Sequence, residues 1–147
     1  MKSMWQEATR RELTERLAKL TVETPARWGT MTAPRMVAHI TQSFRSAFGD
    51  LAVAPKHLPL RFSPLKQFVV YWMPFPRNAP TAPELLAKEP GDWADDVREL
   101  AALMERFAVR DPRAAWPEHA AFGRLSGGQW GVLMYRHTDH HFRQFGV

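Results

Sequence analysis

The chain contains no cysteine, and this absence excludes disulfides, thiolate metal sites and cysteine nucleophiles. Any metal must therefore be held by nitrogen and oxygen ligands. No segment sustains the alternation of apolar and polar residues that marks a half-buried strand, so an all-α protein is expected. The longest apolar run, residues 68–73, ends at Pro74 and is far too short to cross a bilayer.

Composition indicates an ordinary globular chain. The 147 residues are 45% hydrophobic and 12% aromatic, which fits one domain over residues 1–147. Charged residues occur throughout the first 19 positions, where a secretory signal would need an apolar stretch, so a cytoplasmic protein is expected. A net charge of +5 makes nucleic-acid binding a third and weaker hypothesis. No nucleic-acid-binding motif accompanies the basic residues, and we expect neither a nucleic-acid nor a membrane partner.

Apolar residues recur at helical spacing in four stretches, two of them in the first third of the chain. The first helix is expected over residues 3–20, because Ser3 and Gln6 have the spacing of a capping box. The second is expected over residues 32–48, with Thr32 as its N-cap.

The other two helices lie in the second half of the chain. The third is expected from Asp92 to Arg110, before an Asp-Pro pair that stops it. The fourth is expected from Ser126, which has capping-box spacing to Gln129, to a point near the C-terminus. The two glycines after Ser126 are poor helix formers, so this helix is expected to fray at its start.

A proline-rich connection separates the second and third helices. Within it we expect a short apolar helix over residues 63–74 and a loop over residues 77–88, with one turn at residues 83–87. A four-helix bundle with a long crossover between its second and third helices has this order of elements.

Half of the six histidines fall within five positions of the fourth helix, as His137, His140 and His141. His137 and His141 are four residues apart, so their rings share one helix face and could bind a single divalent metal. On a helical projection, both side chains lie on the same face as Trp130, which points into the bundle interior. Five neighbours are expected on the flanks or the far side: Tyr135, Arg136, Asp139, Phe142 and Arg143, with Asp139 paired to one of the two arginines at the surface.

A metal site needs further ligands, and His39 of the second helix is the best candidate. His140 sits on the shoulder of the buried stripe as a lining residue, while Gln144 returns to the histidine face as a partner for a ligand. His119, in the loop before the fourth helix, could cap the same cavity. The alternative is a hydrogen-bonded core in which these histidines contact Ser43, Gln144 and water.

The chain resembles the DinB-like (YfiT-like) metal-binding four-helix bundles, in particular a branch described only as a domain of unknown function. The motifs that carry the resemblance are Arg27-Trp28-Gly29, Met31 to His39, Pro74-Phe75-Pro76, His119 to Gly123, and His137 to Gly146. The resemblance implies His39, His137 and His141 as the metal ligands. It also implies a homodimer, and thiol S-transfer with bacillithiol, mycothiol or glutathione among the activities of relatives.

These observations favour a metal-dependent enzyme whose divalent ion is Zn, Ni or Fe. Three neutral imidazoles leave the ion an open position and most of its charge, which can lower the pKa of a bound water or thiol. The expected partner is a small molecule, such as a low-molecular-weight thiol, in a transfer or a hydrolysis; no catalytic residue is assigned. The alternative is a non-catalytic helical bundle, a binding or stress protein with a structural metal or none.

Overall fold

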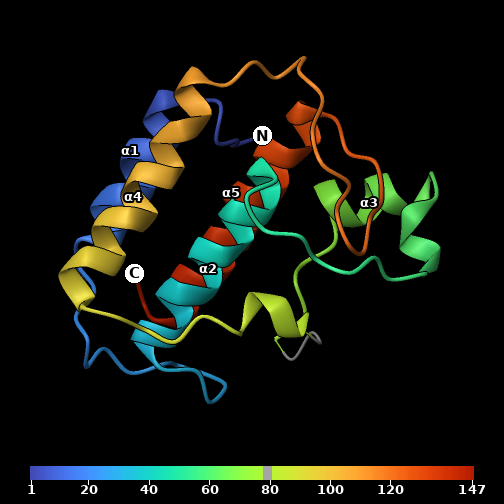
Figure 1. Cartoon of the computed structure of the whole chain (residues 1–147). Coiled ribbons are helices and arrows are strands. Elements are labelled where there is room, and N and C mark those ends of the chain that lie inside the picture. The colour runs from blue at the N-terminus through green and yellow to red at the C-terminus, as the bar shows by residue number, and fades with distance from the viewer. Residues whose placement is uncertain (78–80) are drawn as a thin grey trace.

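The computed structural model describes residues 1–77 and 81–147 of the chain (Figure 1). Five α-helices and two short 3-10 helices follow in order: α1 (Glu7–Leu17), α2 (Ala33–Phe48), η1 (Pro59–Arg61), α3 (Leu65–Tyr71), η2 (Pro83–Leu85), α4 (Trp93–Val109) and α5 (Gly127–Gln144). Over the described ranges there is no β-strand, only an isolated antiparallel bridge between His119 and Gly123. The prediction of an all-α protein is therefore confirmed.

The four longer helices surround a common core. In Figure 1 α1 lies beside α4 and α2 beside α5, and α2 also contacts α4 while α1 contacts α5. The core side chains include Phe44 from α2, Phe107 from α4 and Trp130 from α5, none more than 1% exposed. The short helix α3 packs on α5, away from α4. No helix in the described part of the chain is both long and apolar enough to cross a membrane.

The boundaries of three helices agree with the sequence expectation because each begins at its expected cap. Thr32, Asp92 and Ser126 accept a hydrogen bond from the backbone N–H three residues ahead of them. At Ser126 the Gln129 side chain also accepts from the Ser126 N–H, at 2.9 Å, which completes the expected capping box.

The first helix begins four residues later than expected, at Glu7, and ends at Leu17. Met4 and Trp5 hydrogen-bond to α5 instead, and these contacts compete with a helical start at Ser3. The Met4 N–H donates to the Gly131 carbonyl at 3.0 Å, and the Trp5 Nε1–H donates to the Gly127 carbonyl at 2.9 Å. Because the Met4 side chain is fully buried, this segment gains more from tertiary packing than from another helical turn.

Two residues expected on the flanks or the far side of α5 make contacts that the sequence did not indicate. Phe142 is fully buried against the α1 side, where the Arg16 guanidinium lies 5.5 Å from its ring centroid. Asp139 pairs with Arg143 as expected, at 3.0 Å, but also with Arg16 of α1, at 2.8 Å. The reason is that α5 contacts α1, α2 and α3, so little of its circumference faces solvent.

Arg136 takes a role that charge pairing did not predict. Its guanidinium donates to the carbonyls of Val69, Val70 and Met73, the first at 2.9 Å, at the C-terminal end of α3. The Val69 and Val70 carbonyls lie in the last turn of α3, where a helix supplies no N–H partner, and Met73 follows shortly after it. Arg136 therefore caps α3 and ties it to α5.

The proline-rich connection contains the elements that the sequence indicates, in shorter form. The expected helix over residues 63–74 is α3, which is only seven residues long. The expected turn over residues 83–87 is η2, and the part of the expected loop at residues 78–80 lies outside the described residues. Both α3 and η2 flank the histidine-bearing faces of α2 and α5, because η2 contacts α2 and α3 contacts α5.

Candidate metal centre

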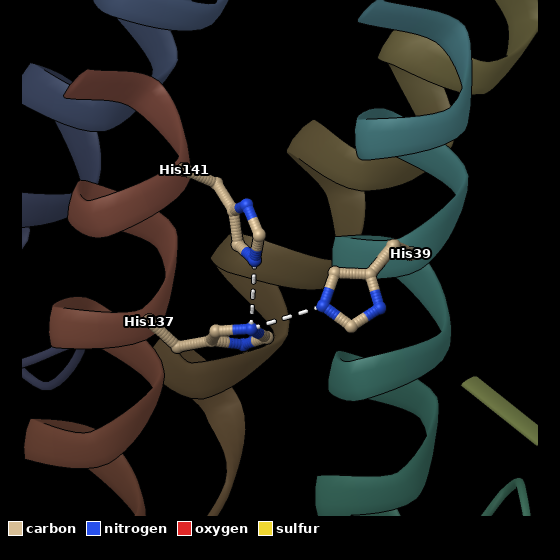
Figure 2. A group of neighbouring side chains, drawn as sticks. All are labelled: His39, His137 and His141. Carbon is tan, nitrogen blue, oxygen red and sulfur yellow. Dashed lines mark hydrogen bonds between the residues drawn. The ribbon is translucent and has the colours of Figure 1, made fainter. Parts of the chain in front are cut away.

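Three imidazoles from two helices converge on one point. The Nε2 atom of His137 lies 3.1 Å from Nε2 of His39 and 3.1 Å from Nε2 of His141, and Figure 2 shows the three rings facing one another across the gap between α2 and α5. Donor atoms of the three residues all lie within 4.8 Å of one another. For comparison, nitrogen ligands at about 2.0–2.1 Å from a tetrahedral zinc ion stand about 3.3–3.4 Å apart.

The other nitrogen of His39 and of His141 is bonded to a protein oxygen, and these bonds fix the tautomers. Nδ1 of His39 lies 3.3 Å from the Leu85 carbonyl, which can only accept, so His39 carries its proton on Nδ1. Nδ1 of His141 lies 2.8 Å from Oε1 of Gln144. The Gln144 amide cannot be reversed, because its Nε2 donates to the Trp28 carbonyl at 2.9 Å. Both histidines therefore present an Nε2 lone pair to His137.

This arrangement suits a cation at the centre. The single proton that neutral His137 can carry on Nε2 satisfies one of its two 3.1 Å contacts, and the other contact then lacks a proton. Electron pairs that face one another at this distance repel, and half-satisfied polar clusters are costly when they are shielded from water. A divalent ion would remove the conflict, because each lone pair could then bind the metal. The residues present thus fit a metal ion on the chemistry of their donors.

All three rings are neutral near pH 7, as metal ligands must be. Burial holds the pKa of His137 well below its ordinary value of 6.5, and the nearby imidazoles of His141 and His39 lower it further. Burial lowers the pKa of His141 to about 3, against the raising effect of its bond to Gln144. Burial also lowers the pKa of His39, and the Leu85 carbonyl partly offsets that effect.

The three imidazoles line one wall of a cavity of about 710 Å³. His140 lines the same cavity, with its ring centroid 5.8 Å from that of Phe75 and 5.9 Å from that of Trp28. Ser43 lines it too, but its hydroxyl donates to the His39 backbone carbonyl at 2.9 Å and not to an imidazole. A cavity of this size, with mostly apolar walls and a few polar groups, is typical of a small-molecule site.

His119 lies at another part of the cavity wall, in the loop before α5. Its Nδ1 accepts hydrogen bonds from the backbone N–H groups of Ala121 and Phe122, at 3.1 and 3.2 Å. An Nδ1 that accepts twice cannot carry a proton, so the ring is neutral and its proton is on Nε2. Burial, together with Arg61 and Lys56, lowers the pKa of His119 to about 4.

The buried state of His119 predicts a loss of stability in mild acid. In the unfolded chain the ring binds a proton as the pH falls below 6.5, whereas in the folded protein it does so only near pH 4. The contribution of His119 to the free energy of unfolding is therefore fully present above pH 6.5. Between pH 6.5 and 5 that free energy falls by on the order of 2 kcal/mol. Urea titrations of the metal-free protein should show a smaller acid loss for His119→Gln than for the original chain, and identical pH dependences would contradict this assignment.

The structure brings together every candidate residue that the sequence singles out. His39, His137 and His141 form the centre, Gln144 orients one of them, and His140 and His119 line the cavity. Sequence reasoning missed the carbonyls of Leu85 and Trp28, which select the tautomers directly or through Gln144. Backbone carbonyls carry no residue-type signal, although Trp28 lies in the Arg-Trp-Gly motif already noted.

Comparison with known proteins gives a family but no activity. The family described as "Protein of unknown function (DUF1569)" matches residues 8–146 of the chain. No curated protein and no solved structure matches the chain. The matched range includes all three converging histidines, so the function must be argued from these residues and the cavity beside them.

Proposed function

Since the chain belongs to DUF1569, a family of proteins of unknown function, we propose its function from the site itself: a metal-dependent enzyme that acts on a small molecule. In this proposal His39, His137 and His141 bind one divalent ion, Zn, Ni or Fe. The observation that carries the proposal is the pair of fixed tautomers, which point two Nε2 lone pairs at His137 where only one proton is available.

The cavity supports a catalytic site over a purely structural one. A structural site is closed by four protein ligands, whereas three histidines that line a cavity leave a position for a substrate or water. A divalent ion held here would act as a Lewis acid, which lowers the pKa of a water or thiol and polarises an electrophile. The residues of the chain keep the imidazoles neutral, orient them through Leu85 and Gln144, and surround the reacting groups with apolar walls.

The finer assignment is to the DinB-like four-helix bundles, as a single domain over residues 1–147. Three features support it: a histidine on α2, an i,i+4 pair on α5, and a long connection between α2 and α4 that contains α3. The reaction then belongs to transfer of a low-molecular-weight thiol to an electrophile, or to hydrolysis. A homodimer and a cytoplasmic location remain part of this proposal.

Metal analysis tests the proposal directly. Protein purified without a histidine tag should contain close to one Zn, Ni or Fe per chain, or take up one equivalent of added Zn²⁺ with a rise in melting temperature. A catalytic site should also leave the bound metal accessible, so that an added small thiol perturbs the d–d spectrum of Co²⁺-substituted protein. Failure to bind any of these metals refutes the proposal, and a metal that no small ligand reaches favours the non-catalytic alternative.

Gln144 should affect metal affinity without being a ligand. Gln144→Leu removes the oxygen that fixes the His141 tautomer, and loss of such a partner costs roughly 10–100-fold in metal affinity. Competition with a chromophoric chelator would measure the change. Gln67→Leu, at an exposed position of α3, is the matched control and should bind zinc as the original chain does. Equal affinities for the two variants would contradict the role of Gln144.

A further inference from the structure

Lys56 and His119 lie side by side on the cavity wall. The Lys56 backbone N–H donates to the carbonyl of Ala120 at 2.7 Å, which ties residue 56 to the loop that carries His119. Both side chains line the cavity that the metal centre faces. The two residues come from segments 63 positions apart in the sequence, so only the fold brings them together.

Each of these groups offers a hydrogen-bond donor that no acceptor in the described part of the chain takes. The proton of His119 must be on Nε2, because Nδ1 accepts two backbone N–H groups, and Nε2 has no partner among the described residues. Within those residues the Lys56 ammonium also lies within 4 Å of no carboxylate. The Lys56 charge contributes to lowering the pKa of Glu84, but the two side chains form no ion pair. The Glu84 carboxylate accepts a hydrogen bond from the Ala54 N–H instead.

Among its described residues the cavity wall has no carboxylate. Its described lining includes Lys56 and Arg77 but no aspartate or glutamate. Arg61 also approaches this end, although the carboxylate of Glu118 neutralises it at 2.8 Å. An ammonium without an ion-pair partner beside a fixed N–H donor favours a ligand with a negatively charged oxygen.

We infer that His119 and Lys56 form an anion subsite, at which His119 Nε2–H and the Lys56 ammonium bind a carboxylate of the substrate. That the ligand is a substrate rests on the proposed function, whereas the binding itself does not. His119 is then a specificity residue and its ring stays neutral throughout.

The position of the subsite also limits the shape of the substrate. The His119 ring packs against Trp130, with 5.2 Å between ring centroids, and Trp130 precedes His137 by seven residues on α5. Seven residues correspond to about 10 Å along a helix. Apolar side chains of Leu133 and Met134 line the cavity between these positions. The fitting molecule is an elongated organic anion, with its carboxylate at Lys56, an apolar middle and its reactive group at the three histidines.

Octanoate, with octan-1-ol as an uncharged probe of equal length, tests the subsite by calorimetry on the full chain, both metal-free and zinc-loaded. Loss of a charge-assisted hydrogen bond should weaken octanoate binding at least about tenfold in Lys56→Met. Octanol binding should not change. Lys19→Met, which alters an exposed lysine outside the cavity lining, should bind octanoate as the original chain does.

His119 provides a second measurement that does not depend on a variant's folding. In ¹⁵N-edited spectra of the original chain, the His119 ring should show the Nε2–H tautomer, and octanoate but not octanol should shift its Nε2 signal. His119→Phe should lose octanoate affinity about as much as Lys56→Met. Absence of octanoate binding, or binding that is indifferent to Lys56 and leaves the His119 signal unchanged, overturns the subsite. Zinc uptake is scored separately, so a subsite without metal refutes only the proposed function, and the reverse result refutes only the subsite.

Discussion

His137→Ala should lower zinc affinity by at least about a hundredfold, because apparent binding free energies of roughly 10–16 kcal/mol for four-ligand zinc sites correspond to about 3 kcal/mol per ligand. His137 is the central residue of the three, since its Nε2 lies 3.1 Å from both of the others. Chelator competition would measure the loss. His57→Ala, which removes an exposed histidine, is the matched control and should retain full affinity.

The same variant distinguishes a metal centre from a hydrogen-bonded histidine core. If the imidazoles stabilise the fold by bonding to one another, removal of His137 should cost the metal-free protein about 1–3 kcal/mol, as lost buried hydrogen bonds do. If they are arranged for an ion, removal relieves the conflict between lone pairs, and the metal-free stability should change by less than about 1 kcal/mol. Urea unfolding of the metal-free proteins decides between the two, and a large loss of stability would favour the core interpretation.

Gly127→Ala should destabilise the protein by about 3 kcal/mol or more, although alanine is the better helix former. A Cβ at this position would lie 2.3 Å from the backbone oxygen of Pro112 and 2.6 Å from Nε1 of Trp116. Because the nearer atom belongs to the backbone, the clash can be relieved only by moving the loop that leads to His119. Urea titration of the variant would measure the change in free energy of unfolding.

The neighbouring Gly128 is the matched control, because alanine there should change the free energy of unfolding in the opposite direction. A Cβ on Gly128 would meet only the Ser126 Oγ, at an ordinary 3.7 Å. Gly128→Ala should therefore stabilise the helix by a few tenths to about 1 kcal/mol. Equal effects of Gly127→Ala and Gly128→Ala would mean that helix propensity, and not close packing, governs the start of α5.

The parts of the fold that could be predicted are those with a local physical cause. Thr32, Asp92 and Ser126 cap helices through their own side chains, so their positions follow from residue type and spacing. The His137–His141 pair was predicted to share a face for the same reason, since four residues make about one helical turn. His39 could be placed on a helix from its periodicity, but its approach to His137 depends on how α2 packs against α5.

The parts that were missed depend on contacts between distant segments. Gln6 was expected inside a helix, but the segment around Met4 binds the backbone of α5 instead. The glycine at position 127 predicted only a frayed start to α5, and its real constraint comes from Pro112 and Trp116. Nothing in the sequence indicated that Lys56 lies near His119. The two are brought together by the hydrogen bond from the Lys56 N–H to the Ala120 carbonyl, which forms only in the folded chain.

In a chain without cysteine, an ion shared by His39 and His137 would join two segments that lie 98 positions apart. Such a staple closes a long loop, and long loops lose the most chain entropy when their ends are tied. Amide hydrogens of α2 and α5 should then exchange with solvent together and more slowly once the ion is bound. The two helices would separate only after the ion had left, so release of the ion from its histidines would have to precede local unfolding here.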